Sequence, residues 1–435
     1  MLTFIKKNDL LILLVVYFFL LPIGKTLWYP LLVMAIVGGV AFIREIKATQ
    51  GLQTGTRWLL AGGACVYLPA LASTVNTVDP GRTGVFLVSY PLFFLAGYFI
   101  YNRLCSGARI GPILWSFAAI VFFWGSLAVW QYLDPSNPFG PGGSHNQGLH
   151  SRDNRFVDGG LMLGVILGSV FAFLTLGLWD KGFGKSAVLT GAAIIFLVFI
   201  SGTRSAWVST LFTIFAITIY ALVRGWRPSL TRSLFVVSFL IILLGAGYKL
   251  YQPLDIGNKL DQTLSVLSHP TKDGFDRALG GRLAIWEDAI ALGLQSPIVG
   301  YGVNNYRYAI GQLAEPKGPW ITEVKDQNSK HRVQGVTHAH QIFMEVIAGA
   351  GFIGLLGIVV FFAGLTSFSV TVFKEGTLIT AGALLSLWAG FLPFNTHNNF
   401  YGGWMNAWFW VWMGLSAGLY FRTTNKEVKP NSQEK

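Results

Sequence analysis

The chain has 435 residues, of which 53% are hydrophobic and only 12% are charged, with a formal net charge of +12. So few charges exclude a soluble globular protein of this length. The only two cysteines, Cys65 and Cys105, suggest neither a disulfide framework nor a metal site.

Apolar runs long enough to cross a hydrocarbon core of roughly 30 Å recur along the chain. Because no water there can satisfy backbone polar groups, each run is predicted to be a helix. The sequence therefore predicts an all-α, polytopic integral membrane protein with about twelve transmembrane helices. The predicted spans are 9–23, 28–43, 58–75, 84–101, 112–133, 159–179, 187–202, 205–223, 233–250, 339–372, 377–394 and 404–421.

Lys and Arg are unevenly distributed over the short loops between these spans. One set of loops is rich in them, whereas the opposite set carries only Lys25, Arg82, Arg152, Arg155 and Arg204. Since positive residues mark cytoplasmic loops, both termini are predicted to be cytoplasmic. The net charge then reflects topology, and no nucleic acid partner is needed to explain it. The resulting division is 1–250 (transmembrane helices one to nine), 251–338 (a large loop with short helices on the outer side of the membrane), 339–421 (helices ten to twelve) and 422–435 (a cytoplasmic tail).

Ionisable residues are nearly absent from the predicted spans, apart from Glu345 and Lys249 near span ends. Ion-coupled transporters usually carry such groups, or broken helices, near the midplane of the membrane. The unusual polar residues gather in outer segments instead. This pattern favours chemistry at the outer membrane–water boundary over transport.

Two outer loops carry polar or aromatic candidates. Segment 134–156 is rich in Pro, Gly, Asn and Ser, so it is either a solvated connector or a loop that offers Arg152 and Arg155 to a substrate. Segment 395–410 contains His397, a further candidate for substrate contact. It also contains three tryptophans that are predicted to form an interfacial aromatic belt, with sugar stacking as the alternative: Trp404, Trp408 and Trp410.

The long outer segment contains one clear helical pattern. Apolar positions from Leu283 to Leu292 follow a helical period, and the helix is predicted to end near Gln295-Ser296-Pro297. A short amphipathic helix of this kind lies on a membrane or packs across a helix bundle. Residues 301–305 are predicted to form a tight turn.

Two arginines are candidates for binding an anion. Arg204 lies at the outer turn between spans seven and eight, where it either snorkels to lipid headgroups or faces a cavity. Arg282 follows two glycines at the start of the amphipathic helix, and helix starts favour anions. Two planar guanidinium groups would suit the phosphate oxygens of a lipid-linked pyrophosphate. A surface ion pair between Arg282 and Asp276 is the alternative.

Two histidines precede span ten. Thr337 is predicted to cap this helix, which would place His338 and His340 in its first turn. The positive end of the helix dipole would keep an imidazole neutral, as a general base requires. On a helix, His338 would share a face with Gln341 and Glu345, and His340 would point roughly 200° away.

The alternatives for these histidines are a structural capping role and a metal site. Zinc requires three or four ligands, and His331 is the only nearby third nitrogen. No metal and no cofactor is therefore predicted.

Together these motifs resemble the O-antigen ligase/polymerase superfamily of bacterial membrane glycosyltransferases. His340-Gln341, nine residues and then Gly351 to Gly354 are similar to the ligase signature that follows a long periplasmic loop. Ser201-Gly202-Thr203-Arg204 is similar to the arginine motif of the family. The stretch from Arg282 through Trp286 to the glycines near Tyr301 is similar to its Arg-x3-Trp motif.

The resemblance implies a metal-independent, GT-C-like enzyme of the bacterial inner membrane with its active site on the periplasmic side. In a ligase of this family, O-polysaccharide on undecaprenyl pyrophosphate is the donor, and a sugar hydroxyl of lipid A–core is the acceptor. Carried over to this chain, His340 would be the base, His338 its neighbour, and Arg204 and Arg282 the donor-pyrophosphate ligands. Trp286, Gln341 and Glu345 are further candidates for substrate contact.

Three other functions compete with the ligase. An O-antigen polymerase would use the same donor and a second lipid-linked glycan as acceptor. A protein O-oligosaccharyltransferase often carries a larger C-terminal periplasmic extension, whereas this chain ends in a short tail. A transporter of lipid-linked glycans would be expected to carry charge within its spans.

Overall fold

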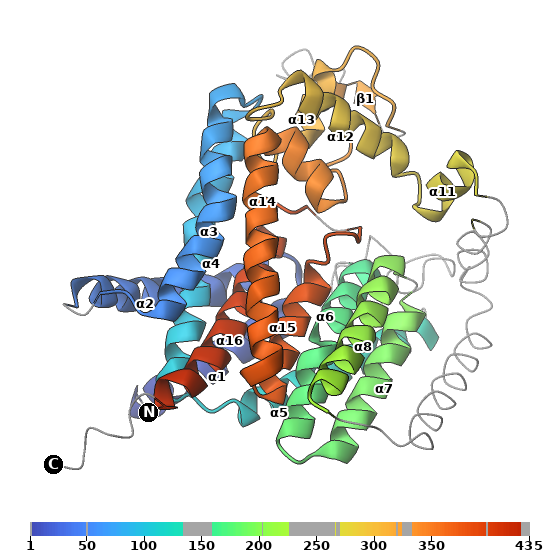
Figure 1. The fold of residues 1–435 in the computed structure, drawn as a ribbon. Coiled ribbons are helices and arrows are strands. Elements are labelled where there is room, and N and C mark those ends of the chain that lie inside the picture. The colour runs from blue at the N-terminus through green and yellow to red at the C-terminus, as the bar shows by residue number, and fades with distance from the viewer. Residues whose placement is uncertain are drawn as a thin grey trace.

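A computed structural model of the chain describes residues 2–48, 51–133, 159–201, 203–225, 266, 270–318, 321–323, 333–396 and 399–427. These residues are almost entirely helical (Figure 1). The first half contains α1 (Leu2–Leu20), η1 (Gly24–Leu27), α2 (Trp28–Lys47), α3 (Thr54–Ala72), η2 (Ser73–Asn76), α4 (Pro80–Cys105), α5 (Gly111–Leu133), α6 (Gly159–Asp180), α7 (Gly184–Ile200) and α8 (Arg204–Val223). The second half contains α11 (Lys272–Ala278), α12 (Leu283–Gln295), α13 (Tyr306–Ala309), η5 (Ile310–Gln312), β1 (Thr322–Glu323), β2 (Val333–Gln334), α14 (Ile342–Glu375), α15 (Leu378–Gly390) and α16 (Gly403–Glu427).

Five of the described helices are long and apolar enough to cross a membrane, and five more are shorter apolar helices. This composition indicates a polytopic membrane protein and agrees with the all-α prediction. Every predicted span except the ninth overlaps a described helix; the ninth, 233–250, lies outside the described residues. The total of twelve spans stays a prediction.

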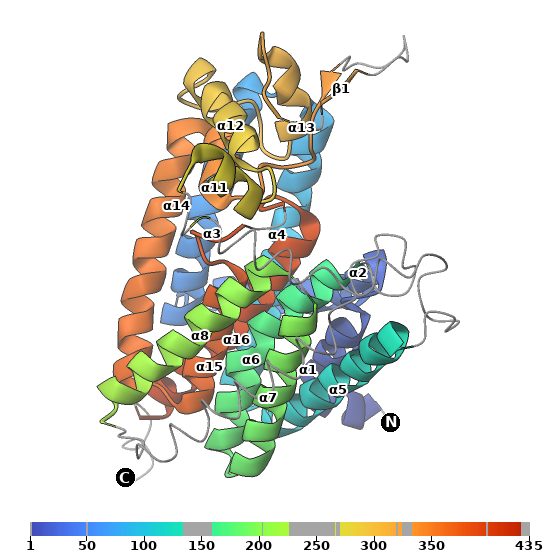
Figure 2. The ribbon, with the colours of Figure 1, turned by 90° about the vertical axis from the view of Figure 1, so that its right-hand side faces the viewer.

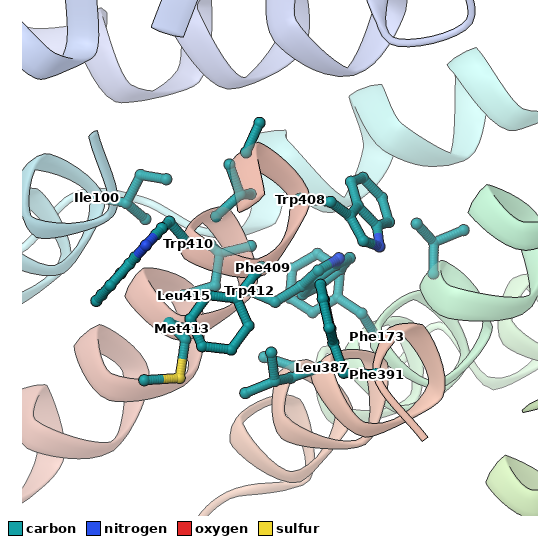
Figure 3. Packing of buried hydrophobic residues seen from close by; sticks show 14 of the residues in the cluster. Ile100, Phe173, Leu387, Phe391, Trp408, Phe409, Trp410, Trp412, Met413 and Leu415 are labelled. Atoms are coloured by element: carbon teal, nitrogen blue, oxygen red, sulfur yellow. The ribbon is translucent and has the colours of Figure 1, made fainter. Parts of the chain in front are cut away.

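The centre of the bundle is built around α16, which packs against α4 and α15. The side chains of Trp408, Trp410 and Trp412 are fully enclosed there, as Figure 3 shows. Helix α4 approaches so closely that a Cβ added at Gly97 would lie 2.6 Å from the carbonyl oxygen of Trp410. The predicted aromatic belt is therefore wrong for Trp408 and Trp410, and Trp404 stacks on Trp408 at a centroid distance of 6.0 Å. These indoles supply packing area in the core.

A small lobe that contains α12, α13 and the two-stranded sheet lies over one end of α3, α4 and α14 (Figures 1 and 2). The strands pair antiparallel, with Thr322 opposite Gln334 and Glu323 opposite Val333. A separate apolar core lies between α12, α13 and the start of α14; it includes Ile285, Ala289, Leu292, Tyr306, Ala339 and Ala348. The helix predicted from Leu283 to Gln295 is confirmed, and it packs across the bundle on α14.

Residues 296–305, here called the wedge, join this lobe to a kink in α14. Gly351 adopts φ 60° and ψ −154°, which interrupts the helix. The next two amides donate instead to the wedge, from Phe352 N to Pro297 O at 2.7 Å and from Ile353 N to Ile298 O at 3.3 Å. A Cβ at Gly351 would lie 2.6 Å from the carbonyl carbon of Ile298, so only glycine fits.

The other side of the wedge is bonded to the connection between α3 and α4. The amide nitrogen of the buried Asn305 side chain donates to the hydroxyls of Thr77 at 2.7 Å and Thr83 at 2.9 Å. The amide nitrogen of the Asn76 side chain likewise donates to the hydroxyl of Ser296 at 2.8 Å. The predicted turn at 301–305 is confirmed, with Asn304 at φ 62°. These bonds fix the position of α12, and thus of Arg282 and Trp286, over the bundle.

Candidate active site

His338 and His340 lie in an irregular segment just before α14, beneath the lobe. Their ring centroids are 4.0 Å apart, with an angle of 52° between the planes. His340 has φ 57°, the left-handed conformation that is uncommon for residues other than glycine. Such backbone strain persists where the surroundings enforce it, often at functional sites. The prediction that the rings point about 200° apart is wrong.

Helix α14 begins later than the sequence predicted, so Thr337 is not its cap. The capping residue is Gln341, whose Oε1 accepts from the amide of Met344 at 2.8 Å and whose Nε2 donates to Pro393 O at 2.8 Å. The indole nitrogen of Trp286 donates to the carbonyl of Ala339 at 3.0 Å and thereby holds the segment between the histidines. The left-handed turn at His340 prevents a helix from starting earlier.

His338 is the more buried of the two rings, with 7% of its surface exposed. Its Nδ1 shares a hydrogen bond of 2.7 Å with the hydroxyl of Thr337. Its Nε2 has no hydrogen-bond partner within the described part of the chain. Burial, assisted by the charges of His340 and Arg282, lowers the pKa of His338 to about 3. A pKa lowered in this way favours the neutral imidazole of His338 at ordinary pH, and its main cause is burial rather than a helix dipole.

Arg204 is the first residue of α8, and α7 ends four residues earlier at Ile200. Its Nη1 donates to the carbonyl of Ala278 and, at 3.5 Å, to that of Arg277. Both carbonyls lie at the C-terminal end of α11, where the helix dipole places partial negative charge. Arg204 is thus half-buried and held at the C-terminal end of α11.

Arg282 reaches the same end of α11 from the other side. Its Nη1 donates to the carbonyl of Leu279 at 2.7 Å. Asp276, the partner considered for a surface ion pair, instead accepts the amide of Leu283 at 2.8 Å and so caps α12. Burial lowers the pKa of Arg282, and the nearby charge of Arg204 lowers it further. Neither arginine forms an ion pair with a carboxylate in the described ranges.

The remaining predicted residues differ in their placement. Glu345 lies in the first turn of α14, is 2% exposed and accepts the amide of Phe400 at 3.4 Å, so it faces the interior. Trp286 and Gln341 contact the histidine segment and its surroundings, as described above. Arg152, Arg155 and His397 lie outside the described residues.

The structure adds one polar residue that the sequence analysis did not select. Asn395, in the connection between α15 and α16, donates to Ser205 O at 2.7 Å and to the Ser209 hydroxyl at 2.9 Å. The same connection accepts the bond from Gln341 through Pro393. It therefore links the arginine end of α8 with the histidine segment. The cluster of asparagines at 395–399 was the available sequence signal.

Comparison with known proteins gives one informative match. Among curated proteins, none matches this chain. A family model described as O-antigen ligase matches residues 187–359, a range that contains Arg204, Arg282, the wedge and both histidines. Members of this family are glycosyltransferase-like membrane enzymes that use lipid-linked polysaccharides. The matched range is less than half of the chain, and it supports an assignment to the O-antigen ligase/polymerase family.

Proposed function

We propose that the protein is an O-antigen ligase. It transfers O-polysaccharide from undecaprenyl pyrophosphate to a sugar hydroxyl of lipid A–core on the periplasmic face of the bacterial inner membrane. The observation that carries the proposal is a pair of half-buried arginines without carboxylate partners among the described residues, near two histidine rings whose centroids are 4.0 Å apart and of which His338 is neutral.

The arginines are suited to hold the pyrophosphate of the donor. A guanidinium carries five N–H donors, and the hydrogen bonds described for Arg204 and Arg282 use Nη1 only. The remaining donors can bind phosphate oxygens bidentately. Two cations also stabilise the negative charge that develops on the pyrophosphate as it leaves.

His340 is assigned the role of general base because it is the more exposed ring. It accepts the proton of the acceptor hydroxyl while the hydroxyl oxygen attacks the anomeric carbon. The bond from that carbon to the pyrophosphate oxygen breaks, and the configuration inverts in this single displacement. His338, with its Nε2 enclosed, supports the ring of His340 from behind. No metal ion enters this mechanism.

The proposed topology follows from the charge distribution of the loops. Both termini and the tail 422–435 are cytoplasmic, and segment 251–338 is periplasmic. Helices one to nine lie within 1–250 and helices ten to twelve within 339–421, in a GT-C-like arrangement. Cysteines introduced at exposed positions and labelled with an impermeant reagent test this orientation.

The function is tested by transfer with purified protein in lipid nanodiscs. Lipid A–core and lipid-linked repeat units are offered together as acceptors, with lipid-linked polymer as donor. Capping of lipid A–core supports the ligase. Extension of the repeat unit alone identifies a polymerase, and transfer to a protein acceptor identifies an oligosaccharyltransferase. Movement of the intact lipid-linked glycan without any transfer would identify a transporter.

A further inference from the structure

A second cluster of cations surrounds a cavity at the opposite end of the bundle. The cavity has a volume of about 420 Å³ and is lined by Arg109, Lys181 and Arg422. The histidine segment and the cavity lie beyond opposite ends of α14, and the 24 residues that follow its kink at Gly351 alone span about 36 Å. Figures 1 and 2 show the C-terminal ends of α14 and α16 far from the lobe. This cavity is therefore separate from the proposed transfer site.

The charges around the cavity are unbalanced. Lys181 pairs with Asp180 at 3.1 Å, and Asp180 is the only carboxylate among the described lining residues. Arg422 is half-buried and donates from Nη1 to Ala108 O at 2.7 Å, which fixes its guanidinium at the rim. Arg109 is exposed and makes no ion pair with any described residue. Three cations against one carboxylate leave two positive charges uncompensated.

The backbone adds to this positive potential. Helix α5 begins at Gly111 and α15 begins after its cap Thr377, and both residues line the cavity. The N-terminus of a helix carries partial positive charge and unbonded amides, which favour phosphate. The floor is apolar, because Ile110, Ile379 and Leu419 are all buried there. A ligand with a phosphate and an adjoining apolar part would match both the positive potential and the apolar floor of the cavity.

We propose that this cavity binds a phosphate group, as carried by an anionic phospholipid headgroup or by soluble phosphate. Basic pockets between membrane helices commonly receive such headgroups. The apolar floor and the position at helix ends favour the lipid as the source. Nothing in the proposed transfer reaction requires this site.

The test uses the full-length protein in detergent and native mass spectrometry. Retention of phosphatidylglycerol is compared with that of phosphatidylcholine with the same acyl chains, and inorganic phosphate is added in a separate arm. The variant R109Q/K181Q removes two cavity cations. The matched control, R44Q/K47Q, removes two exposed cations from the end of α2, which is not among the described lining residues. The charge-preserving variant R109K/K181R controls for folding.

The wild type is expected to retain phosphatidylglycerol over phosphatidylcholine. Loss of two cations is expected to weaken that binding about 30-fold in R109Q/K181Q, with little change in the two controls. If inorganic phosphate binds the wild type and only R109Q/K181Q loses it, while phosphatidylglycerol is not retained, then soluble phosphate is the source. If R109Q/K181Q binds phosphatidylglycerol and inorganic phosphate as well as the wild type does, the proposal is overturned. An equal loss in R44Q/K47Q would also overturn it.

Discussion

The two cation clusters differ in how their charges are surrounded. Arg204 and Arg282 are half-buried and bonded to backbone carbonyls at the end of α11. In the cavity at the other end of the bundle, Arg109 is exposed and Lys181 forms an ion pair with Asp180. Charges removed from water interact far more strongly than exposed ones. Burial of the cations, rather than their number, therefore distinguishes a site able to stabilise a transition state from one suited to weak binding.

The largest expected effect is at His340, which has no counterpart at the cavity. The variant H340A is expected to lower transfer by about 10² to 10⁴-fold, because a positioned general base contributes that much. Turnover of lipid-linked donor in nanodiscs measures this. The variant W115F, a conservative change at an exposed position of α5, is the control. Transfer by H340A near the wild-type rate would remove the base assignment.

The next largest loss of transfer is expected at the arginines, where Arg282 can be compared directly with Arg109 of the cavity. R282Q is expected to reduce transfer by about 10² to 10³-fold, because one donor to developing charge is lost. R282K restores the charge but not the planar fork, so it is expected to recover only part of the loss. The variant R109Q at the cavity is the matched control and is expected to leave transfer unchanged. Equal losses in R282Q and R109Q would contradict the distinction between the two clusters.

A smaller effect is expected in the stability of the protein at acid pH. The folded pKa of His338, about 3, lies below its ordinary value of 6.5, so the unfolded chain binds more protons between these values. The free energy of unfolding is therefore unaffected above about pH 6.5 and falls by up to about 1.4 kcal/mol per pH unit below it.

Thermal unfolding followed by tryptophan fluorescence at several pH values measures this slope. H338Q, which cannot titrate, is expected to show a shallower decline between pH 6.5 and 4 than the wild type. R109Q, far from the ring, serves as control and should keep the wild-type slope. An unchanged slope in H338Q would show that other groups dominate the acid response.

The smallest effect is expected at Trp286, which contacts the histidine segment without a charge. W286F removes the hydrogen bond to Ala339 O and retains most of the packing. A net loss of about 1 kcal/mol, or roughly fivefold in transfer, is expected for one such bond. A fall in kcat at constant donor KM would indicate a positioning role. A rise in KM alone would favour direct contact between Trp286 and the substrate.

Several elements of the site could be predicted from local sequence patterns. The helix from Leu283 to Gln295 follows its apolar period, and the short turn before Arg204 follows the boundary between two apolar runs. The spacing from His340 to Gly351 has a structural meaning, because Gly351 marks the kink that receives the wedge. Each of these features depends on neighbours close in the chain.

Other features depend on contacts between distant segments. The close approach of the His338 and His340 rings depends on Gln341 as the cap and on the indole of Trp286 at Ala339, which lies 53 residues away in the sequence. The burial of Trp408 and Trp410 follows from the close approach of α4 at Gly97. Local amphipathic character could not distinguish a belt at the membrane surface from a core position.

The helical membrane class, the order of the motifs and the candidate residues could all be predicted from the sequence, because hydropathy and charge act along the chain. Which cations come together and how deeply each ring is buried depend on contacts between distant segments. Arg204 and Arg282 are separated by 78 positions, yet both bond to the end of α11, as the folded chain brings their helices together. Desolvation and hydrogen-bond partners are properties of that arrangement, and they give the histidine pair its neutral ring.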